Sequence, residues 1–385
     1  MSRLELDAPR LQRLAVQAER LGLLRLGAVS LDEPALAGAR IALDRFLDSG
    51  RVGDMAFMER TRDLRKFPQR LLPGARTALV SAIPYRGEPG PIARYAQSQD
   101  YHTVAHRRLL AFERELQREL PGIEMLICVD TKPVPERALA ALAGVGVLGK
   151  NGCLIVPGLG SYVVIGVLLC TASYDAHANR PVSCRTSSSS SSSSRSPSSP
   201  RERDASAAKP TPWQVCGSCT ACLDACPTDA FVAPGELDAR RCIAYLTIEH
   251  RGPVSPDLAE HLGQRVAGCD VCQEVCPHNH SEARNDRAPD HAWLPPPLGR
   301  DRTPDLLRLL SIGNNQYRGF VRHTALTRIP RRSMRRNAAL ALAHAQPRGL
   351  EVEHRLEELA NDVDPVLRDA ARWAFGFLKK RGSST

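Results

Sequence analysis

The stretch Cys216-Gly-Ser-Cys219-Thr-Ala-Cys222-Leu-Asp-Ala-Cys226-Pro227 decides the fold of the middle of this chain. Its cysteines follow the spacing C-x₂-C-x₂-C-x₃-C-P, which is typical of bacterial ferredoxins that carry two 4Fe–4S clusters. Short spacers bring the first three thiolates to one cluster, and the fourth cysteine ligates the other cluster. A second set, Cys242 with Cys269-Asp-Val-Cys272-Gln-Glu-Val-Cys276-Pro277, lies downstream. The two sets predict a ferredoxin-like double 4Fe–4S module over residues 213–290.

By analogy with such ferredoxins, we expect the two sets to exchange ligands. One cluster is then held by Cys216, Cys219, Cys222 and Cys276, and the other by Cys226, Cys242, Cys269 and Cys272. Zinc is the alternative, since two Cys₄ sites could use the same residues. Zinc sites pair two C-x₂-C knuckles and do not call for runs that end in C-P, so the spacing favours iron–sulfur. Cys128, Cys153 and Cys170 lie in or beside apolar strands, and we interpret them as core residues.

Composition points to a soluble protein with a polyanionic partner. The chain has 385 residues, 43% of them hydrophobic, and a formal net charge of +10. No apolar run is long enough to span a membrane, and no apolar signal core opens the chain, so a cytoplasmic location is expected. Disulfides are disfavoured in that compartment, which makes clustered thiols metal ligands. The positive charge suggests nucleic acid as a partner, although a merely solvated basic surface is the alternative.

Patterning on either side of the cysteines divides the chain further. Up to about residue 170, amphipathic helices alternate with short apolar runs of strand length, which predicts an α/β domain over residues 1–170. Residues 171–212 include the serine run Ser187–Ser194 and predict a disordered low-complexity insertion, unless they are a lineage-specific loop or an error of the gene model. Residues 303–380 have a helical pattern, and the apolar faces at Ala338–Ala345 and Ala370–Leu378 hint at stacked helix pairs.

Several short motifs outside the cysteine sets carry a family resemblance. They include Gly53-Asp-Met55, Arg65 with Leu71-Leu-Pro-Gly74, Arg94-Tyr95, Asp100-Tyr-His102, Val129-Asp130-Thr131, Glu136-Arg137, Gly149-Lys150-Asn151, Arg240-Arg-Cys242 and Arg336-Asn337-Ala338. In this arrangement the chain resembles the epoxyqueuosine reductases over most of its length, residues 171–212 excepted. The resemblance implies an α/β cobalamin-binding domain, a ferredoxin-like double 4Fe–4S module and C-terminal α-helical (HEAT-like) repeats.

The resemblance also implies a reaction and its cofactors. Such an enzyme reduces epoxyqueuosine to queuosine at the wobble position of tRNA, using cobalamin that two 4Fe–4S clusters supply with electrons. The implied partners are tRNA bearing epoxyqueuosine and an electron donor of the flavodoxin or ferredoxin type, with the enzyme acting as a monomer. Cofactors of this kind carry the difficult chemistry, while the protein positions and protonates the substrate.

Site residues follow from the positions that match the family's motifs. Asp130 matches the proton donor, and a carboxyl group buried beside a corrin is expected to have a raised pKa. The positions that match cobalamin contacts are Arg65, Asp130, Lys150, Asn151 and Asp270. The positions that match tRNA contacts are Pro135, Glu136, Arg137, Arg331, Arg332 and Arg336. Ordinary surface or helix-end polarity is the alternative for Arg65, Lys150 and Asn151.

A basic segment near the C-terminus supports an RNA partner. Residues 318–336 read RGFVRHTALTRIPRRSMRR, with seven arginines and no acid. That density favours phosphate contacts, and a basic linker between helix pairs is the alternative. Two other functions remain open from the residues alone. One is a cobalamin-dependent reductase of a small molecule, similar to a dehalogenase; the other is a simple ferredoxin-like electron-transfer protein without a substrate of its own.

Overall fold

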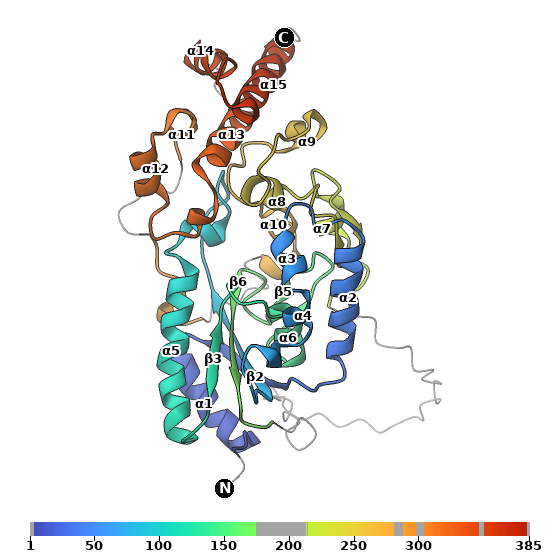
Figure 1. The fold of residues 1–385 in the computed structure, drawn as a ribbon, viewed down its shortest axis with the longest axis vertical. Coiled ribbons are helices and arrows are strands. Elements are labelled where there is room, and N and C mark those ends of the chain that lie inside the picture. The colour runs from blue at the N-terminus through green and yellow to red at the C-terminus, as the bar shows by residue number, and fades with distance from the viewer. Residues whose placement is uncertain are drawn as a thin grey trace, which may run out of the picture.

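The computed structural model describes residues 4–174, 213, 215–280, 288–297, 304–345 and 350–382 (Figure 1). Of the low-complexity segment expected over residues 171–212, everything from residue 175 onward lies outside the described residues. Within the described residues no helix is long and apolar enough to cross a membrane. The division into four regions at residues 170, 212 and 303 stays a prediction.

A four-stranded sheet forms the centre of the N-terminal region, in the order β1-β2-β6-β3. The strands are β1 (Leu24–Ser30), β2 (Thr77–Pro84), β6 (Val163–Cys170) and β3 (Met125–Cys128). Neighbouring strands pair antiparallel throughout. The expected combination of helices and strands is therefore present, and its pairing is antiparallel rather than the parallel arrangement that alternating strands and helices often adopt.

Helices cover both faces of this sheet (Figure 1). Helices α1 (Ala8–Arg20) and α5 (Tyr101–Glu119) pack on one face, and α6 (Glu136–Leu142) packs on the other with α2 (Leu36–Asp48) outside it. Alternate residues of β2 accordingly belong to different apolar clusters: Leu79 and Ile83 face the α5 side, whereas Val80 faces the α6 side. A strand buried on both faces is apolar throughout, which explains the continuous apolar runs in the sequence.

The cysteine-rich region is built from short elements. They are α7 (Ala221–Asp224), β7 (Phe231–Ala233), β8 (Glu236–Leu237), α8 (Ile243–Ile248), α9 (Pro256–His261), α10 (Val271–Glu274) and the 3₁₀ turn η3 (Pro277–Asn279). The remaining short elements of the N-terminal region are α3 (Ala56–Arg60), α4 (Arg62–Lys66), η1 (Pro68–Arg70), η2 (Arg94–Gln97), β4 (Val147–Leu148) and β5 (Leu154–Ile155). These short elements surround the cysteines and the site described below.

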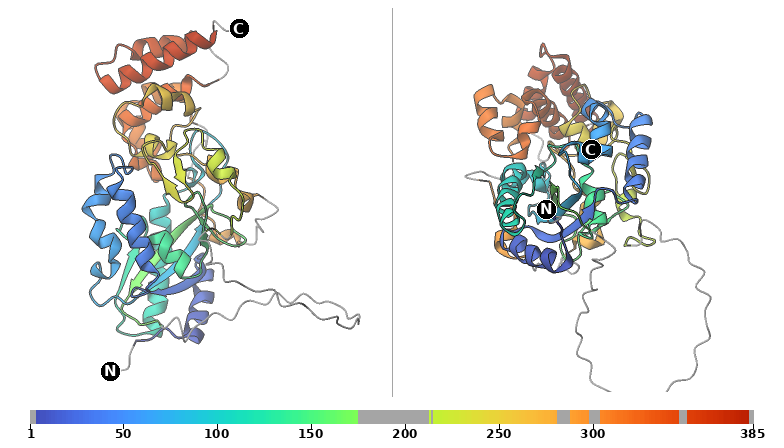
Figure 2. Two further views of the ribbon diagram at one scale, coloured as in Figure 1. Left: turned by 90° about the vertical axis from the view of Figure 1, so that its right-hand side faces the viewer. Right: turned by 60° about the horizontal axis from the view of Figure 1, so that its bottom comes forward.

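Helices form the described residues of the C-terminal region, which lies at the end of the molecule opposite the N-terminus (Figures 1 and 2). They are α11 (Leu306–Ser311), α12 (Asn314–Val321), α13 (Arg331–Leu342), α14 (Leu350–Leu359) and α15 (Pro365–Gly382), with the 3₁₀ turns η4 (Asp290–Ala292) and η5 (Ala325–Arg328) before them and between them. Helix α13 packs against both α11 and α15. The expected helical region is therefore present, while its assignment to HEAT-like repeats stays a prediction.

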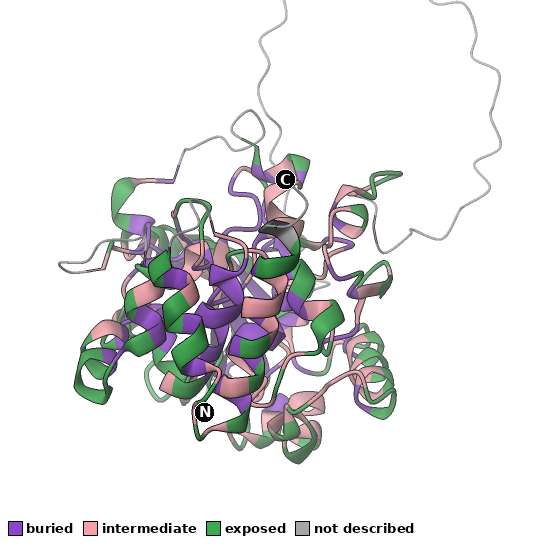
Figure 3. Cartoon of the chain, turned by 90° about the horizontal axis from the view of Figure 1, so that it is seen from above, coloured by how far each residue is buried: buried purple, intermediate pink, exposed green. Residues whose placement is uncertain are grey.

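The core is continuous from the sheet to the last helix. One cluster of buried side chains joins Leu14 of α1, Leu246 of α8 and Leu378 of α15. Seen from above, buried residues fill the interior and exposed ones the rim of the molecule (Figure 3). The three regions thus share apolar contacts, which favours fixed positions for side chains that meet between them.

Candidate active site and cluster module

The first group of thiols gathers around Cys222. Burial, followed by the neighbouring thiols of Cys216, Cys276 and Cys219, raises the pKa of Cys222 to about 11. Of these residues Cys219 is exposed, whereas Cys222 and Cys276 are buried. Cys276 therefore lies with the first cysteine run, although it is distant from it in the sequence.

The cysteines of the second group are half-buried. Burial raises the pKa of Cys242, and Cys226 adds to that rise. Burial, with Cys242 among the neighbouring charges, also raises the pKa of Cys269 to about 11. The thiol of Cys272 neighbours both Cys269 and Cys242. The two groups match the crossed ligation that the spacing predicts, and the ligand assignment itself stays a prediction.

Residues of the β4–β5 turn contact both cysteine groups. The amide of Asn151 donates to the carbonyl oxygen of Cys272 at 3.1 Å. The ammonium of Lys150 donates to the carbonyl oxygens of Gly217 and Cys219 at 2.8 and 2.9 Å. Cys153, interpreted from the sequence as a core residue, is half-buried, and its thiol is a neighbour of Cys272. The turn therefore fastens the N-terminal region to the cluster loops, which spacing alone does not reveal.

Asp130 lies on a tight loop between β3 and α6. Its φ of +52° is in the left-handed region that a non-glycine residue rarely adopts. Its backbone N–H donates to Oε1 of Glu136 at 2.5 Å, and the N–H of Thr131 donates to the carbonyl of Val129. Strained backbone held in this way is frequent at functional sites, where it fixes the direction of a side chain.

Two neighbours on α5 meet the same oxygen of Asp130. The hydroxyl of Tyr101 donates to Oδ2 at 2.6 Å, and Nε2 of His102 lies 3.7 Å from that atom. On its far side, Nδ1 of His102 lies 2.7 Å from Oδ1 of Asp100. The side chain of Asp130 is 63% exposed. One carboxylate oxygen is thus held by the protein, and the other can face a substrate.

The electrostatics of this loop differ from the sequence expectation. The contact with His102 outweighs burial, and together with Tyr101 it lowers the pKa of Asp130 instead of raising it. The raised pKa in the site belongs to Glu136, where burial and then the charge of Asp130 bring it to about 8. Two carboxyl groups with opposite shifts lie side by side, a pattern that is typical of sites for acid–base chemistry.

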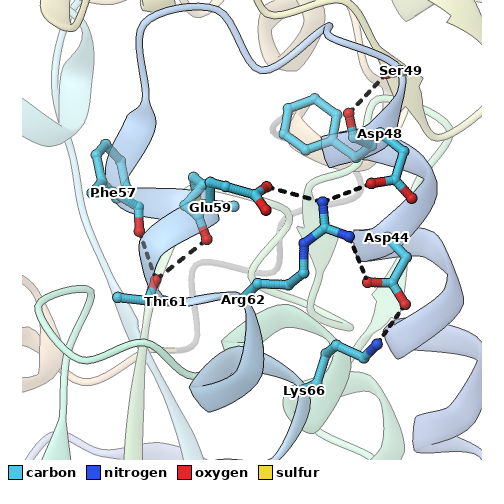
Figure 4. Close-up of polar contacts among 10 residues, drawn as sticks. Asp44, Asp48, Ser49, Phe57, Glu59, Thr61, Arg62 and Lys66 are labelled. Atoms are coloured by element: carbon cyan, nitrogen blue, oxygen red, sulfur yellow. Dashed lines mark hydrogen bonds and ion pairs between the residues drawn. The ribbon is translucent and has the colours of Figure 1, made fainter.

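A network of ion pairs fixes the α3–α4 segment against α2 (Figure 4). The guanidinium of Arg62 lies 3.3 Å from Asp44, 2.6 Å from Asp48 and 2.9 Å from Glu59. Lys66 pairs with Asp44 at 2.6 Å. These contacts position the two short helices that carry Phe57 and Arg65.

The start of the same segment is fastened to α8. The N–H of Asp54 donates to the hydroxyl of Tyr245 at 2.6 Å, and the Asp54 carboxylate contacts Nδ1 of His250 at 2.7 Å. Gly53 has a φ of +61°, and a Cβ there would lie 2.4 Å from the Tyr245 hydroxyl. Only glycine fits such an approach in that conformation.

Arg65 and Arg328 meet over Phe57 at the edge of the site. Their guanidinium carbons lie 5.9 and 5.3 Å from the centre of its ring. Arg328, from η5, is also held by both carboxylate oxygens of Glu249 at 2.8 and 2.9 Å. Its charge acts on Asp130, as Arg65 does on Glu136. Sequence reasoning did not single out Phe57, Arg328, Tyr101 or His102 as site residues, although Tyr101 and His102 lie in a matched motif.

Asp270 connects the cysteine groups to the Asp130 loop. Its carboxylate accepts the N–H of Arg94 at 2.8 Å. Burial, and then the charges of Asp130 and Asp270, raise the pKa of Tyr95, so both aspartates act on its hydroxyl. A cavity of about 200 Å³ opens beside Asp270, lined by Pro89, Gly90, Pro91, Ala93, Gln264, Arg265, Gly268, Cys269, Asp270 and Glu274. The buried Nε of Arg94 has no hydrogen-bond partner among the described residues.

The structure corrects the prediction for one residue of the basic segment 318–336. Arg336 has no exposed surface. Its guanidinium donates to the carbonyls of His250, Gly252 and Leu246. A side chain enclosed in this way cannot reach a phosphate, so the prediction that Arg336 contacts tRNA is wrong.

The neighbouring arginines are also engaged within the protein, although they remain accessible. Arg331 donates to the carbonyl of Ile312 at 2.9 Å, and the exposed Arg332 pairs with Asp364 at 2.9 Å. Arg318 and Arg322 are exposed, and their side chains make no hydrogen bond or ion pair with other described residues. The exposed arginines of the segment that no described residue engages therefore lie on α12, at Arg318, and directly after it, at Arg322.

Two family models match the chain. The model of a 4Fe-4S double cluster binding domain matches residues 215–279, and that of "Epoxyqueuosine reductase QueG, DUF1730" matches residues 65–131. The first covers the two cysteine groups and decides between iron–sulfur and zinc. The second spans Arg65, the α5 residues and Asp130.

Curated relatives and solved structures extend the similarity to most of the chain. An epoxyqueuosine reductase of Gloeobacter violaceus is 34% identical over 87% of this chain and 96% of its own length. One from Xanthomonas campestris is 32% identical over 94% of both chains. A crystal structure of epoxyqueuosine reductase with an epoxyqueuosine-modified tRNA-Tyr stem loop covers 95% of this chain and 89% of its own, with 29% identity and a TM-score of 0.71. A Bacillus subtilis structure with its catalytic aspartate loop swung out of the active site has 28% identity over 95% of this chain and 90% of its own, and a TM-score of 0.70. The chain belongs to the epoxyqueuosine reductase family.

Proposed function

We propose that this oxidoreductase reduces epoxyqueuosine to queuosine in tRNA with bound cobalamin, two 4Fe–4S clusters and Asp130 as proton donor. Membership of the family carries the reaction and its tRNA substrate. The observation that supports the site most strongly is the Asp130 loop, whose carboxylate is held at one oxygen and faces outward with the other. Removing an epoxide oxygen as water consumes two electrons and two protons, so the site must deliver both.

We expect cobalamin to lie against the residues around Asp270. A cavity adjoins the second cysteine group, and the buried Nε of Arg94 beside it lacks a partner among the described residues. We expect Asp270, Asn151 and Arg65 to hold the cofactor, with the Lys150 side chain acting indirectly because it is engaged by the cluster loop. When bound, cobalamin would supply the reducing metal. The clusters beside it would supply electrons one at a time.

The substrate nucleotide would enter over the Asp130 loop. Pro135, Glu136 and Arg137 follow that loop directly, and Phe57 with its two arginines offers a surface on which a base can stack. Arg331 and Arg332, joined by Arg318 and Arg322, would bind the phosphates of the anticodon arm. Phosphate contacts position the RNA, and the pocket around Asp130 would read the modified base.

Electron supply and cellular setting complete the proposal. The exposed Cys219 marks the first cluster as accessible to a carrier of the flavodoxin or ferredoxin type. Iron–sulfur ligation and a tRNA substrate both suit a cytoplasmic enzyme. We expect it to act as a monomer.

A single-turnover reaction tests the proposal. The protein would be reconstituted anaerobically with iron, sulfide and cobalamin, reduced, and mixed with epoxyqueuosine-containing tRNA, whose nucleosides are then scored for queuosine. Wild type should form queuosine, and Asp130→Asn should form at least 100-fold less in the same time, which is about the value of a general acid. If both clusters and cobalamin bind but wild type forms no queuosine, a small-molecule substrate becomes the better interpretation. If Asp130→Asn reacts at the wild-type rate, another group is the proton donor.

A further inference from the structure

The proposed reaction takes up more protons than Asp130 can hold at one time. Reducing the epoxide to an alkene and water takes up two protons, and one carboxyl group carries one proton at a time. In addition, Asp130 is an ionised side chain near neutral pH, because its contact with His102 lowers its pKa. A second group must therefore hold the proton that Asp130 delivers.

His102 has the geometry for that task. Its ring lies between two carboxylates, with Nδ1 at 2.7 Å from Asp100 and Nε2 at 3.7 Å from Asp130. The ring stacks on that of Tyr101 with the centroids 4.0 Å apart. The side chain is 32% exposed, which leaves it a route to solvent protons. A distance of 3.7 Å is long for a hydrogen bond, but catalytic contacts are often long before the substrate closes the site.

We infer that His102 is the positioning residue that supplies protons to Asp130, through the line Asp100–His102–Asp130. The inference rests on the proposed function. In each delivery the Nε2–H bond of His102 breaks as an O–H bond forms at Oδ2 of Asp130. The carboxyl group then turns to present this O–H bond to the substrate, and the bond breaks as the proton passes to the substrate oxygen. His102 is left neutral and takes a new proton from water. Two such deliveries and the two electrons of the clusters balance the conversion of the epoxide to alkene and water.

The charged surroundings keep His102 protonated between turnovers. Burial alone would lower its pKa, but the contacts with Asp100 and then Asp130 outweigh burial and raise it to about 9. Tyr101 stays protonated, because burial and the charge of Asp130 raise its pKa. Arg328, from η5, and Glu136, from α6, face Asp130 from the other elements of the site, and Glu136 is mostly neutral below about pH 8.

The pH profile of the single-turnover rate separates this role from a structural one. Wild type should keep its rate up to about pH 9 and lose it above, as His102 deprotonates. His102→Gln should react at least 10-fold more slowly at neutral pH, with a rate that rises as the pH falls and Asp130 takes its proton directly from water. Asp100→Asn should move the alkaline loss to lower pH. His106→Gln, an exposed histidine one turn further along α5, is the matched control and should keep the wild-type profile.

A second measurement does not depend on turnover. With histidine labelled by ¹³C and the clusters oxidised, one resonance that is missing in His102→Gln should titrate near pH 9, and lower in Asp130→Asn. Two results would overturn the inference. One is a pH profile of the rate that is the same in His102→Gln as in wild type. The other is a His102 resonance that titrates at the same pH in Asp130→Asn as in wild type. If wild type itself forms no queuosine, the proposed function fails instead, and the titration still reports whether the proton line exists.

Discussion

At the scale of single residues, the site depends on side chains whose partners come from other elements. Asp130 was recognisable from the sequence because it lies in a matched motif. Its protonation was not, because His102 and Tyr101 approach it only through the packing of α5 beside β3. The sequence expectation of a raised pKa concerned a carboxyl group beside a corrin, whereas charges and hydrogen-bond donors of the protein itself lower the pKa of Asp130.

Glu136 offers a test of the electrostatics of the loop. Its pKa of about 8 in the folded protein lies above the ordinary value of 4.5, so the folded state binds the extra proton between these values. Its contribution to stability is therefore greatest below about pH 4.5 and falls as the pH rises to about 8. Glu136→Gln keeps an oxygen for the Asp130 N–H and removes the titration. In thermal unfolding, the melting temperature of the variant relative to that of wild type should rise between about pH 5.5 and about pH 8.5. A constant difference in melting temperature across that range would contradict the raised pKa.

At the scale of elements, the helices and strands followed closely from apolar periodicity. Helix α5, Tyr101–Glu119, has an amphipathic pattern, and strand β6, Val163–Cys170, is an apolar run of strand length. The antiparallel pairing did not follow, because β2 and β6 are distant in sequence and a continuous apolar run fits either direction. The pairings of the C-terminal arginines were equally hidden, since their partners lie at residues 246–252, 310–312 and 362–364.

Helix α12 should carry the accessible part of the RNA surface. The double substitution Arg318→Ala with Arg322→Ala removes two exposed charges without breaking an internal contact of their side chains among the described residues. Because each phosphate contact releases counterions, the slope of log affinity against log salt should fall by roughly 1.5. Binding of the tRNA at several salt concentrations measures that slope. Arg13→Ala with Arg20→Ala, on exposed positions of α1, is the control. Equal slopes for all three proteins would place the RNA elsewhere.

At the scale of the whole molecule, one buried residue joins the C-terminal helices to the cluster region. Arg336 of α13 donates to three carbonyls of the α8 segment, and Asn337 donates to Thr247 and Val266 at 2.8 Å. The sequence predicted the three regions but not this contact between α13 and the α8 segment, because an arginine in a basic segment is expected to be exposed. Burial of its guanidinium among main-chain oxygens gives Arg336 a structural role.

Arg336→Ala should therefore act on stability. Removing the side chain leaves buried carbonyls unsatisfied and opens a cavity, which should lower the free energy of unfolding by about 3 kcal/mol or more. Chemical denaturation measures the loss. Arg332→Ala, at an exposed ion pair, should change stability by less than about 1 kcal/mol. The salt dependence of tRNA binding should be the same in folded Arg336→Ala as in wild type. A reduced slope with unchanged stability would restore Arg336 to the RNA surface.

The most direct measurement is a single-turnover reaction in which only cobalamin is left out. Protein with both clusters reconstituted would be divided, loaded with cobalamin or not, reduced identically and mixed with epoxyqueuosine-containing tRNA. Up to one queuosine per enzyme should form in the loaded sample and almost none in the other. Equal amounts of queuosine in the two samples would contradict the proposed cofactor, and no queuosine in either would contradict the reaction itself.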